Sequence, residues 1–273
     1  MYEVRFWGVR GSIATPGAAW ARYGGNTSCI EVRAGAHHFI LDGGTGLRPL
    51  GASLAGQTGL DLHLLLTHTH VDHLCGIPFF APLYEKSNRV TMWAGHLADG
   101  TTLRDVLDDY MAAPLFPIRP GVFSAQIRTP RFKAGETIDV GLRVRTAPLR
   151  HPNGATGYRF DGPGGSLAYV TDTEHIPGQP DESVLALIDG ADTVIYDCTY
   201  TDEEFPRFVG WGHSTWQEGV RLCDRAGVRR LVIFHHDPGH DDAFMDAVAA
   251  EADAMRPGTL VAREGDVLTV GAT

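Results

Sequence analysis

HTHVDH, residues 68–73, places three histidines and one aspartate in a single short stretch. It directly follows the apolar run LHLLLT, residues 62–67, which is typical of a buried strand. Neutral imidazole and ionised carboxylate are the usual protein ligands of zinc, iron and manganese. A histidine-rich surface turn is the alternative, but exposed loops seldom need so many ligating side chains together. The stretch therefore predicts a metal site at the end of a strand.

Three further β-rich runs end at a histidine or an aspartate. LRVRTAPLR is followed by His151, LAYVT by Asp172 and RRLVIF by His235. Taken singly, these are more often a surface histidine or a turn residue. Strand ends in α/β layers tend to gather functional side chains at one edge, so we expect these residues to join HTHVDH. The predicted metal-binding residues are His68, His70, Asp72, His73, His151, Asp172 and His235.

Short β-rich runs recur along the whole chain, and helical patterns appear between the later ones. TTLRDVLDDYM, residues 101–111, places its apolar side chains on one helical face. Ser214 with Gln217 predicts a capping box that opens a second helix. Asp241 and Asp242 predict the start of a third helix, which runs to Met255. The order favours a single α/β domain, residues 1–273, in which sheets pack face to face with helices outside.

The segment 79–129 is expected to be a lid or a specificity insertion within that domain. Its least regular part, residues 112–129, carries three prolines around bulky apolar side chains, which favours a loop over a site. Trp93, Tyr110 and Phe116 in this segment could stack on a nucleobase or fill the core.

Composition excludes several functions and locations. The formal net charge of −10 argues against a broad basic surface for nucleic acid or anionic lipid, although a local basic groove stays open. The start MYEVRFWGVRGS has no signal-peptide pattern and no later run is long enough to span a bilayer, so we expect a cytoplasmic protein without membrane contact. The four cysteines form no CxxC pair, which favours reduced structural thiols.

HTHVDH, with a later histidine, a later aspartate and a final histidine, resembles the metallo-β-lactamase fold superfamily over almost the whole chain. GHSTWQEGVRLCDRAGVRRLVIFHHDP, residues 212–238, is similar to its phosphodiesterase branch, which includes RNase Z and cyclic phosphodiesterases. GVRGSIATPG and YGGNTSCIEV near the N-terminus fit that branch too. The resemblance implies a four-layer αββα sandwich and a metal-dependent hydrolase.

The resemblance also implies how two divalent ions would be held. His68, His70 and His151 would bind the first ion, Asp72, His73 and His235 the second, and Asp172 would bridge both. His236 competes with His235, which is preferred because it comes first after the strand. Zn²⁺ is favoured over Mn²⁺ and Fe²⁺, all of which accept these ligands. Two such ions polarise a shared water, so that a bridging hydroxide can attack a phosphodiester.

Four further residues are predicted around this cage. His213 is expected to assist the leaving alkoxide, with Asp197 as its partner, and both count with Asp72 as catalytic residues. RNase Z typically carries Glu where Asp197 stands, so the reach is one methylene shorter. Helix capping for His213 and a turn role for Asp197 are the structural alternatives. Asp42 is expected to support the ligand histidines, and Asn26 to line the phosphate pocket, though both could simply be turn residues.

The interval between His151 and Asp172 has room for a hairpin only, whereas RNase Z enzymes commonly carry a long tRNA-gripping arm there. We therefore expect a small phosphodiester, such as a nucleotide or cyclic nucleotide, and no stable nucleic-acid complex. The alternatives are a lactone or thioester hydrolase of the same fold, a tRNA 3′-end endonuclease, and a non-catalytic sensor that kept the scaffold. The sequence leaves a homodimer open.

Overall fold

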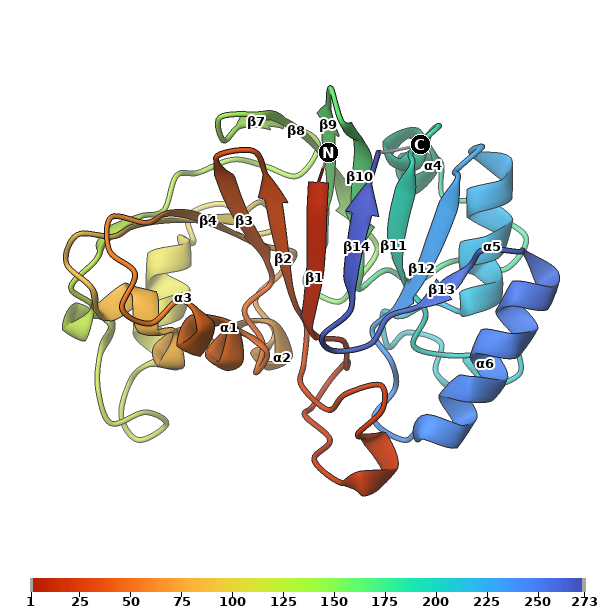
Figure 1. Cartoon of the computed structure of the whole chain (residues 1–273), viewed down its shortest axis with the longest axis horizontal. Coiled ribbons are helices and arrows are strands. Elements are labelled where there is room, and N and C mark those ends of the chain that lie inside the picture. Colours follow the sequence, from red (N-terminus) through yellow and green to blue (C-terminus); the bar gives the residue numbers. More distant parts are fainter. Residues whose placement is uncertain (1, 272–273) are drawn as a thin grey trace.

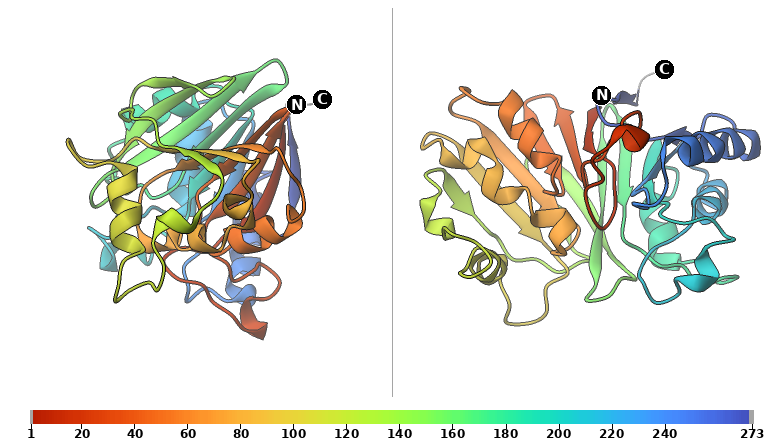
Figure 2. Two further views of the ribbon diagram at one scale, coloured as in Figure 1. Left: turned by 90° about the vertical axis from the view of Figure 1, so that its left-hand side faces the viewer. Right: turned by 90° about the horizontal axis from the view of Figure 1, so that it is seen from below.

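Two β-sheets pack face to face, and helices cover the outer face of each (Figure 1). The computed structural model describes residues 2–271. Seen from below, the layers follow one another as helices, sheet, sheet and helices (Figure 2). The predicted αββα sandwich is confirmed.

The first sheet has the strand order β14-β1-β2-β3-β4-β5-β6. Its β14, β1, β2 and β3 pair antiparallel, whereas β3, β4, β5 and β6 pair parallel. The strands are β1 (Tyr2–Gly8), β2 (Cys29–Ala34), β3 (His37–Leu41), β4 (Asp61–Leu66), β5 (Arg89–Ala94), β6 (Gln126–Arg128) and β14 (Val267–Val270).

The second sheet has the order β13-β12-β11-β10-β9-β8-β7 and repeats this division. Its β7 to β10 pair antiparallel, and β10 to β13 pair parallel. The strands are β7 (Thr137–Asp139), β8 (Arg143–Leu149), β9 (Ala155–Gly162), β10 (Gly165–Val170), β11 (Thr193–Asp197), β12 (Arg230–Phe234) and β13 (Leu260–Val261).

The helices divide between the two outer layers. Those of the first half flank the first sheet and those of the second half flank the second (Figure 1). They are α1 (Leu47–Ser53), α2 (Val71–Leu74), α3 (Leu103–Tyr110), α4 (Glu182–Ile188), α5 (Trp216–Arg225) and α6 (Asp242–Met255).

Three apolar clusters hold the layers together, as expected when strands alternate side chains between two covered faces. The middle cluster joins the sheets through residues such as Phe39 and Phe160, whose ring centroids lie 5.2 Å apart. The second cluster packs the first sheet against α1 and α3, and the third packs the second sheet against α4, α5 and α6. Trp93 lies beside the middle cluster and donates to His63, so of its two predicted roles the structure supports core filling.

Helix boundaries confirm two predictions and correct a third. The helices at α3 and α6 are as predicted, and Asp241 caps α6 by accepting from the backbone of Phe244. Ser214, however, does not cap α5. Thr215 does so by accepting from the Glu218 N–H, because the Ser214 hydroxyl contacts the buried side chains of His175 and Tyr196 instead.

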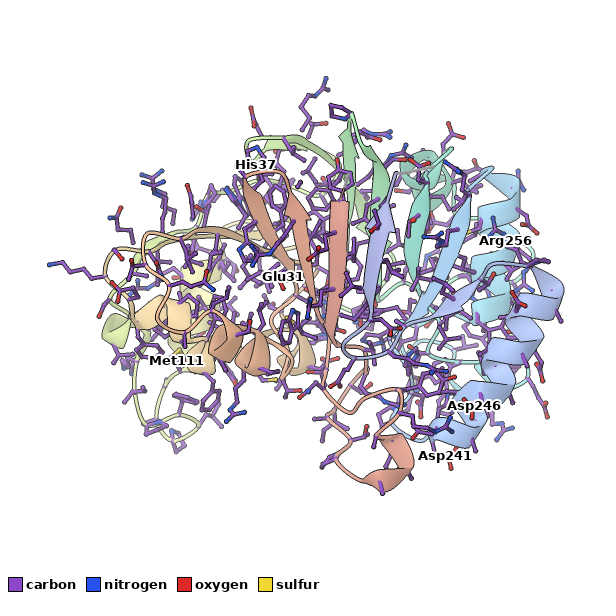
Figure 3. The ribbon with its side chains drawn as sticks, in the orientation of Figure 1. Glu31, His37, Met111, Asp241, Asp246 and Arg256 are labelled. Carbon is purple, nitrogen blue, oxygen red and sulfur yellow. The ribbon has the colours of Figure 1, made fainter. Side chains whose placement is uncertain are left out.

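The segment predicted as a loop from 112 to 129 contains a strand at its end. β6 pairs parallel with β5 and extends the first sheet by one edge strand. It was not predicted because it has only three residues, too few to show an alternating pattern. Residues 111–125 are otherwise irregular, apart from one 3₁₀ turn at Pro120–Val122. Figure 3 labels Met111, where α3 gives way to this segment.

All four cysteines are free thiols, and three of them are buried, as the sequence predicted. Among residues 2–271, the structure contains no helix with the length and apolarity needed to cross a bilayer.

Removing an aromatic ring between the sheets should test this packing. Phe160 is fully buried against Phe39, so Phe160→Ala should lower the free energy of unfolding by about 3–5 kcal/mol. Urea denaturation followed by circular dichroism measures the change. Met255→Ala is the matched control, because that side chain is 56% exposed and its loss should cost about 0.5 kcal/mol or less. Equal shifts in the two variants would contradict the assigned core.

Candidate metal centre

The predicted metal-binding residues follow strand ends that meet at one edge of the two sheets. β4 leads into His68 and His70, and α2 then carries Asp72 and His73. β8 is followed by His151, β10 by Asp172 and β12 by His235. These strands run in the same direction in their sheets, so their carboxyl ends share an edge.

The side chains gather there into two groups of three. His68, His70 and His151 offer ligand atoms that lie within 4.8 Å of one another. Asp72, His73 and His235 form a second group that meets the same limit. His37, in contrast, lies away from these groups, at the upper end of the first sheet, opposite α2 (Figure 3).

Asp172 lies between the two groups and faces each with one oxygen. Its Oδ1 is 3.8 Å from Nε2 of both His68 and His151. Its Oδ2 is 3.3 Å from His73 Nε2 and 3.4 Å from His235 Nε2. Burial opposes the charge of this carboxyl, but the surrounding histidines, His235 foremost, hold its pKa well below the usual range. The arrangement suits a carboxylate shared by two cations.

The ring nitrogens of the cluster point toward one another, and one of them has no partner. His68 Nε2 is buried without a hydrogen-bond partner. His73 Nε2 faces His235 Nε2 at 3.2 Å, and His70 Nδ1 faces His151 Nε2 at 3.1 Å. An unpaired buried polar atom is costly, and a metal ion bound to it would remove that cost. The donor set therefore fits two divalent ions.

Local backbone strain marks the same place. Asp42, Asp172 and His235 adopt φ values of 61°, 61° and 63°. Residues with a side chain pay roughly 1–3 kcal/mol for such conformations, which persist mainly at functional sites. Asp42 and His235 directly follow a strand, and Asp172 follows one after Thr171, so the positive φ turns the chain sharply at the edge where the side chains meet.

Asp42 supports the cluster from behind. Its Oδ2 is 2.9 Å from His73 Nδ1 and accepts from the Tyr169 hydroxyl at 2.8 Å, while Oδ1 accepts from the Thr67 N–H at 2.7 Å. A carboxylate on Nδ1 fixes the tautomer that turns Nε2 toward the centre. This is the contact expected for Asp42.

His213 and Asp197 form a close pair beside the second group. His213 Nδ1 lies 3.1 Å from Asp197 Oδ2, and its ring stacks on that of His235 with centroids 5.0 Å apart. The shorter aspartate therefore does reach the histidine. Burial disfavours the charged imidazole, but the carboxylate outweighs it and raises the pKa of His213 to about 9.

The structure distinguishes His235 from His236 as the last metal ligand and shows the surroundings of Asn26. His236 points away from the cluster, since its Nε2 contacts the Ala262 carbonyl at 2.8 Å, whereas His235 lies within it. The side-chain amide of Asn26 donates to Glu264, and the backbone carbonyl of Asn26 accepts from the N–H groups of Val9 and Arg10. Asn26 is therefore held by segments distant in the sequence and is not part of the two groups of three.

Several supporting residues were not predicted. Glu174 accepts from the N–H groups of Gly210 and Gly212, and the Gly212 carbonyl in turn contacts His151 Nδ1 at 2.8 Å. Thr199 Oγ1 lies 3.0 Å from His235 Nδ1. A local signal existed only for Glu174, which follows Asp172 by two positions in TDTEH.

The N-terminal GVRGS also contributes to the centre. The Ser12 N–H donates to Asp72 Oδ2 at 2.8 Å. A side chain at Gly11 would meet the His235 ring at 2.4 Å, so only glycine allows the backbone to pass there.

Replacing Asp42 by Asn should weaken metal binding without changing the shape of the site. An amide at this position no longer stabilises the Nδ1–H of His73 with a negative charge, so affinity should fall about 10- to 100-fold. Competition with a chromophoric chelator measures it. Asp61→Asn, at an exposed aspartate paired with Arg89, is the control and should leave affinity unchanged. Unchanged affinity in Asp42→Asn would refute the supporting role.

Comparisons with known proteins agree with this geometry. The chain is 28% identical to the ribonuclease Z of Bradyrhizobium sp. (strain ORS 278), over 99% of this chain and 100% of that protein. Two solved structures are similar: YhfI of Bacillus subtilis, a metallo-beta-lactamase fold protein (TM-score 0.72, 19% identity, 98% of both chains), and a diphosphatase of the PhnP family (TM-score 0.71, 18% identity, 98% and 97%).

The likeness to ribonuclease Z supports the RNase Z-like branch that the sequence resembles, and the two solved structures share the fold. Residues 38–236, most of the chain and nearly all of the cluster's strands, match the Beta-lactamase superfamily domain. The chain therefore belongs to the beta-lactamase superfamily.

Proposed function

We propose that this protein is a dinuclear metal-dependent phosphodiesterase that acts on a small nucleotide or cyclic nucleotide. The observation that carries the proposal is the position of Asp172, with one oxygen facing each group of three ligands. A carboxylate placed in this way suits two cations a few ångströms apart, the arrangement that many phosphoester hydrolases use.

The first ion would be held by His68, His70 and His151, and the second by Asp72, His73 and His235. Zn²⁺ suits this imidazole-rich set best, although Mn²⁺ and Fe²⁺ accept the same donors. When bound, two such ions would supply an acidified water as nucleophile and positive charge for the phosphate.

His213 would serve the leaving group. An alkoxide needs a proton as its bond to phosphorus breaks. Asp197 holds Nδ1 of His213 and so fixes the ring, which leaves Nε2 as the nitrogen available to the substrate. Thr173 and Thr199 donate to Asp197 and fix this carboxylate in turn.

The chain offers little surface for gripping a long nucleic acid. Between His151 and Asp172 it forms only the β9–β10 hairpin, with a tight turn after Gly162. A net charge of −10 also disfavours a polyanion. The diphosphatase of the PhnP family shows that phosphate chemistry occurs on a similar fold.

A tRNA 3′-end endonuclease is the second candidate, because the ribonuclease Z relative matches over its full length. A lactone or thioester hydrolase would use the same metal residues but has little need of the His213–Asp197 pair.

One substrate screen separates these functions. The metal-loaded protein is tested against cyclic and linear nucleotides, bis(p-nitrophenyl) phosphate, precursor tRNA, acyl-homoserine lactones and thioesters. We expect hydrolysis of the small phosphodiesters. Lactone or thioester turnover without diester turnover would refute the proposal, and cleavage of precursor tRNA alone would favour the endonuclease.

Replacing His213 by Ala should lower kcat by roughly 100-fold or more for nucleotide diesters with an alkoxide leaving group, because that group loses its proton donor. Bound metal, measured by mass spectrometry of the purified protein, should stay nearly constant. His37→Ala, at the far end of the first sheet, is the control and should change neither quantity. Loss of metal in His213→Ala would show that His213 is a ligand or a structural residue instead.

Substituting glutamine for His235 or for His236 should have different effects on the amount of bound metal. His235→Gln removes a ligand nitrogen from the second group, so we expect about half of the bound metal to be lost. His236→Gln keeps a donor for the Ala262 carbonyl and should retain all of it. Metal content per chain gives the answer, and the reverse pattern would exchange the two assignments.

A further inference from the structure

Trp211 presents a large aromatic side chain to solvent, and it directly precedes a residue that contacts the metal centre. It is 62% exposed, whereas the chain buries most of its bulky apolar side chains. Its neighbour Gly212 contacts His151 through the carbonyl at 2.8 Å. A side chain at Gly212 would meet the His151 ring at 2.3 Å, so the backbone next to Trp211 lies tightly against a predicted metal ligand.

The backbone that carries Trp211 is fixed on both sides. Glu174 accepts from the N–H of Gly210 and from that of Gly212, and the Trp211 N–H donates to the Phe208 carbonyl at 3.0 Å. These bonds fix the backbone from which the indole projects, so less entropy would be lost there when a ligand ring stacks on the indole.

Trp211 is the outer member of a row of aromatic rings that starts inside the site. Tyr200 meets His213 edge to face at 6.1 Å, and Phe208 stacks on Tyr200 at 4.4 Å with an interplanar angle of 6°. Trp211 then meets Phe208 edge to face at 5.5 Å. The row sets the position of the indole relative to the ring that would protonate the leaving group.

Two more exposed apolar side chains are neighbours in sequence of residues at the centre. Val71, 62% exposed, lies between His70 and Asp72. Ile13, 64% exposed, follows Ser12, whose N–H contacts Asp72. The charged centre therefore has an apolar rim, which suits a substrate whose phosphate enters the cluster while its organic part rests outside.

We propose that Trp211 is a specificity-determining residue that stacks on an aromatic ring, a nucleobase, esterified to the substrate phosphate. The inference rests on the proposed phosphodiesterase function and adds to it the group that the enzyme recognises. Every base offers a flat face to an indole, so one exposed tryptophan accepts any of them without hydrogen-bond readout. A phosphate held at the cluster brings its ester group to the rim where Trp211 lies.

Two diesters with the same leaving group test this role. Thymidine 5′-(p-nitrophenyl phosphate) carries a base, and methyl p-nitrophenyl phosphate does not. In Trp211→Ala, the ratio of kcat/KM for the thymidine ester to that for the methyl ester should fall about 5- to 50-fold, mainly through KM. Trp211→Phe should restore most of the ratio. Val209→Ala, at a side chain on the same loop that is also 62% exposed, is the control and should keep the ratio within about twofold of wild type.

An unchanged ratio in Trp211→Ala would overturn the proposal: equal losses on both diesters would indicate a structural role, and no loss on either would show that the indole does not contact the substrate. A change of oligomeric state in sedimentation would also overturn it, because it would assign the indole to an interface between copies.

A binding measurement separates this inference from the proposed function. Thymidine 5′-monophosphate should quench the tryptophan fluorescence of the metal-loaded wild-type protein, and much less that of Trp211→Phe. Quenching of this kind without cleavage of either diester would refute the phosphodiesterase and retain the stacking site. Absence of quenching in the wild type would overturn the stacking site itself.

Discussion

The buried carboxylate of Asp172 lies between two groups of ligand side chains, and the rest of the site is arranged around that position. A buried charge is costly unless it is paired, and here each oxygen faces a different group. Two cations would stabilise the charge of Asp172. One of them would also bind the ring nitrogens of His73 and His235, which face each other at 3.2 Å. The strained backbone at Asp172 and His235 is then the local cost of bringing strand ends together.

The fold supplies what this arrangement requires. Each sheet changes from antiparallel to parallel pairing across its width, and the parallel parts bring several carboxyl ends to one edge. The apolar cluster between the sheets keeps the two edges in register, and the outer helices allow both sheets to be buried. Residues distant in sequence therefore meet without any long loop to carry them.

Much of this could be predicted from the sequence, because HTHVDH is contiguous and the remaining ligands follow recognisable strands. The supporting contacts could not. The role of Glu174 depends on the backbone N–H groups of Gly210 and Gly212. Nearly every residue has such a donor, so the sequence does not show which ones a carboxylate will bind. Ser214 was predicted to cap α5, but Thr215 does so. The Ser214 hydroxyl instead contacts the buried His175, a tertiary contact that the local sequence does not show. Strand β6 was missed because its three residues carry too little pattern.

The most direct measurement is anomalous X-ray diffraction from crystals of the metal-loaded protein, collected on both sides of the metal absorption edge. The account predicts two peaks about 3.5–4 Å apart, with Asp172 between them. One peak should lie among His68, His70 and His151, and the other near Asp72 and His235, with His73 completing that group. A single peak, or none in this cluster, would contradict the dinuclear centre.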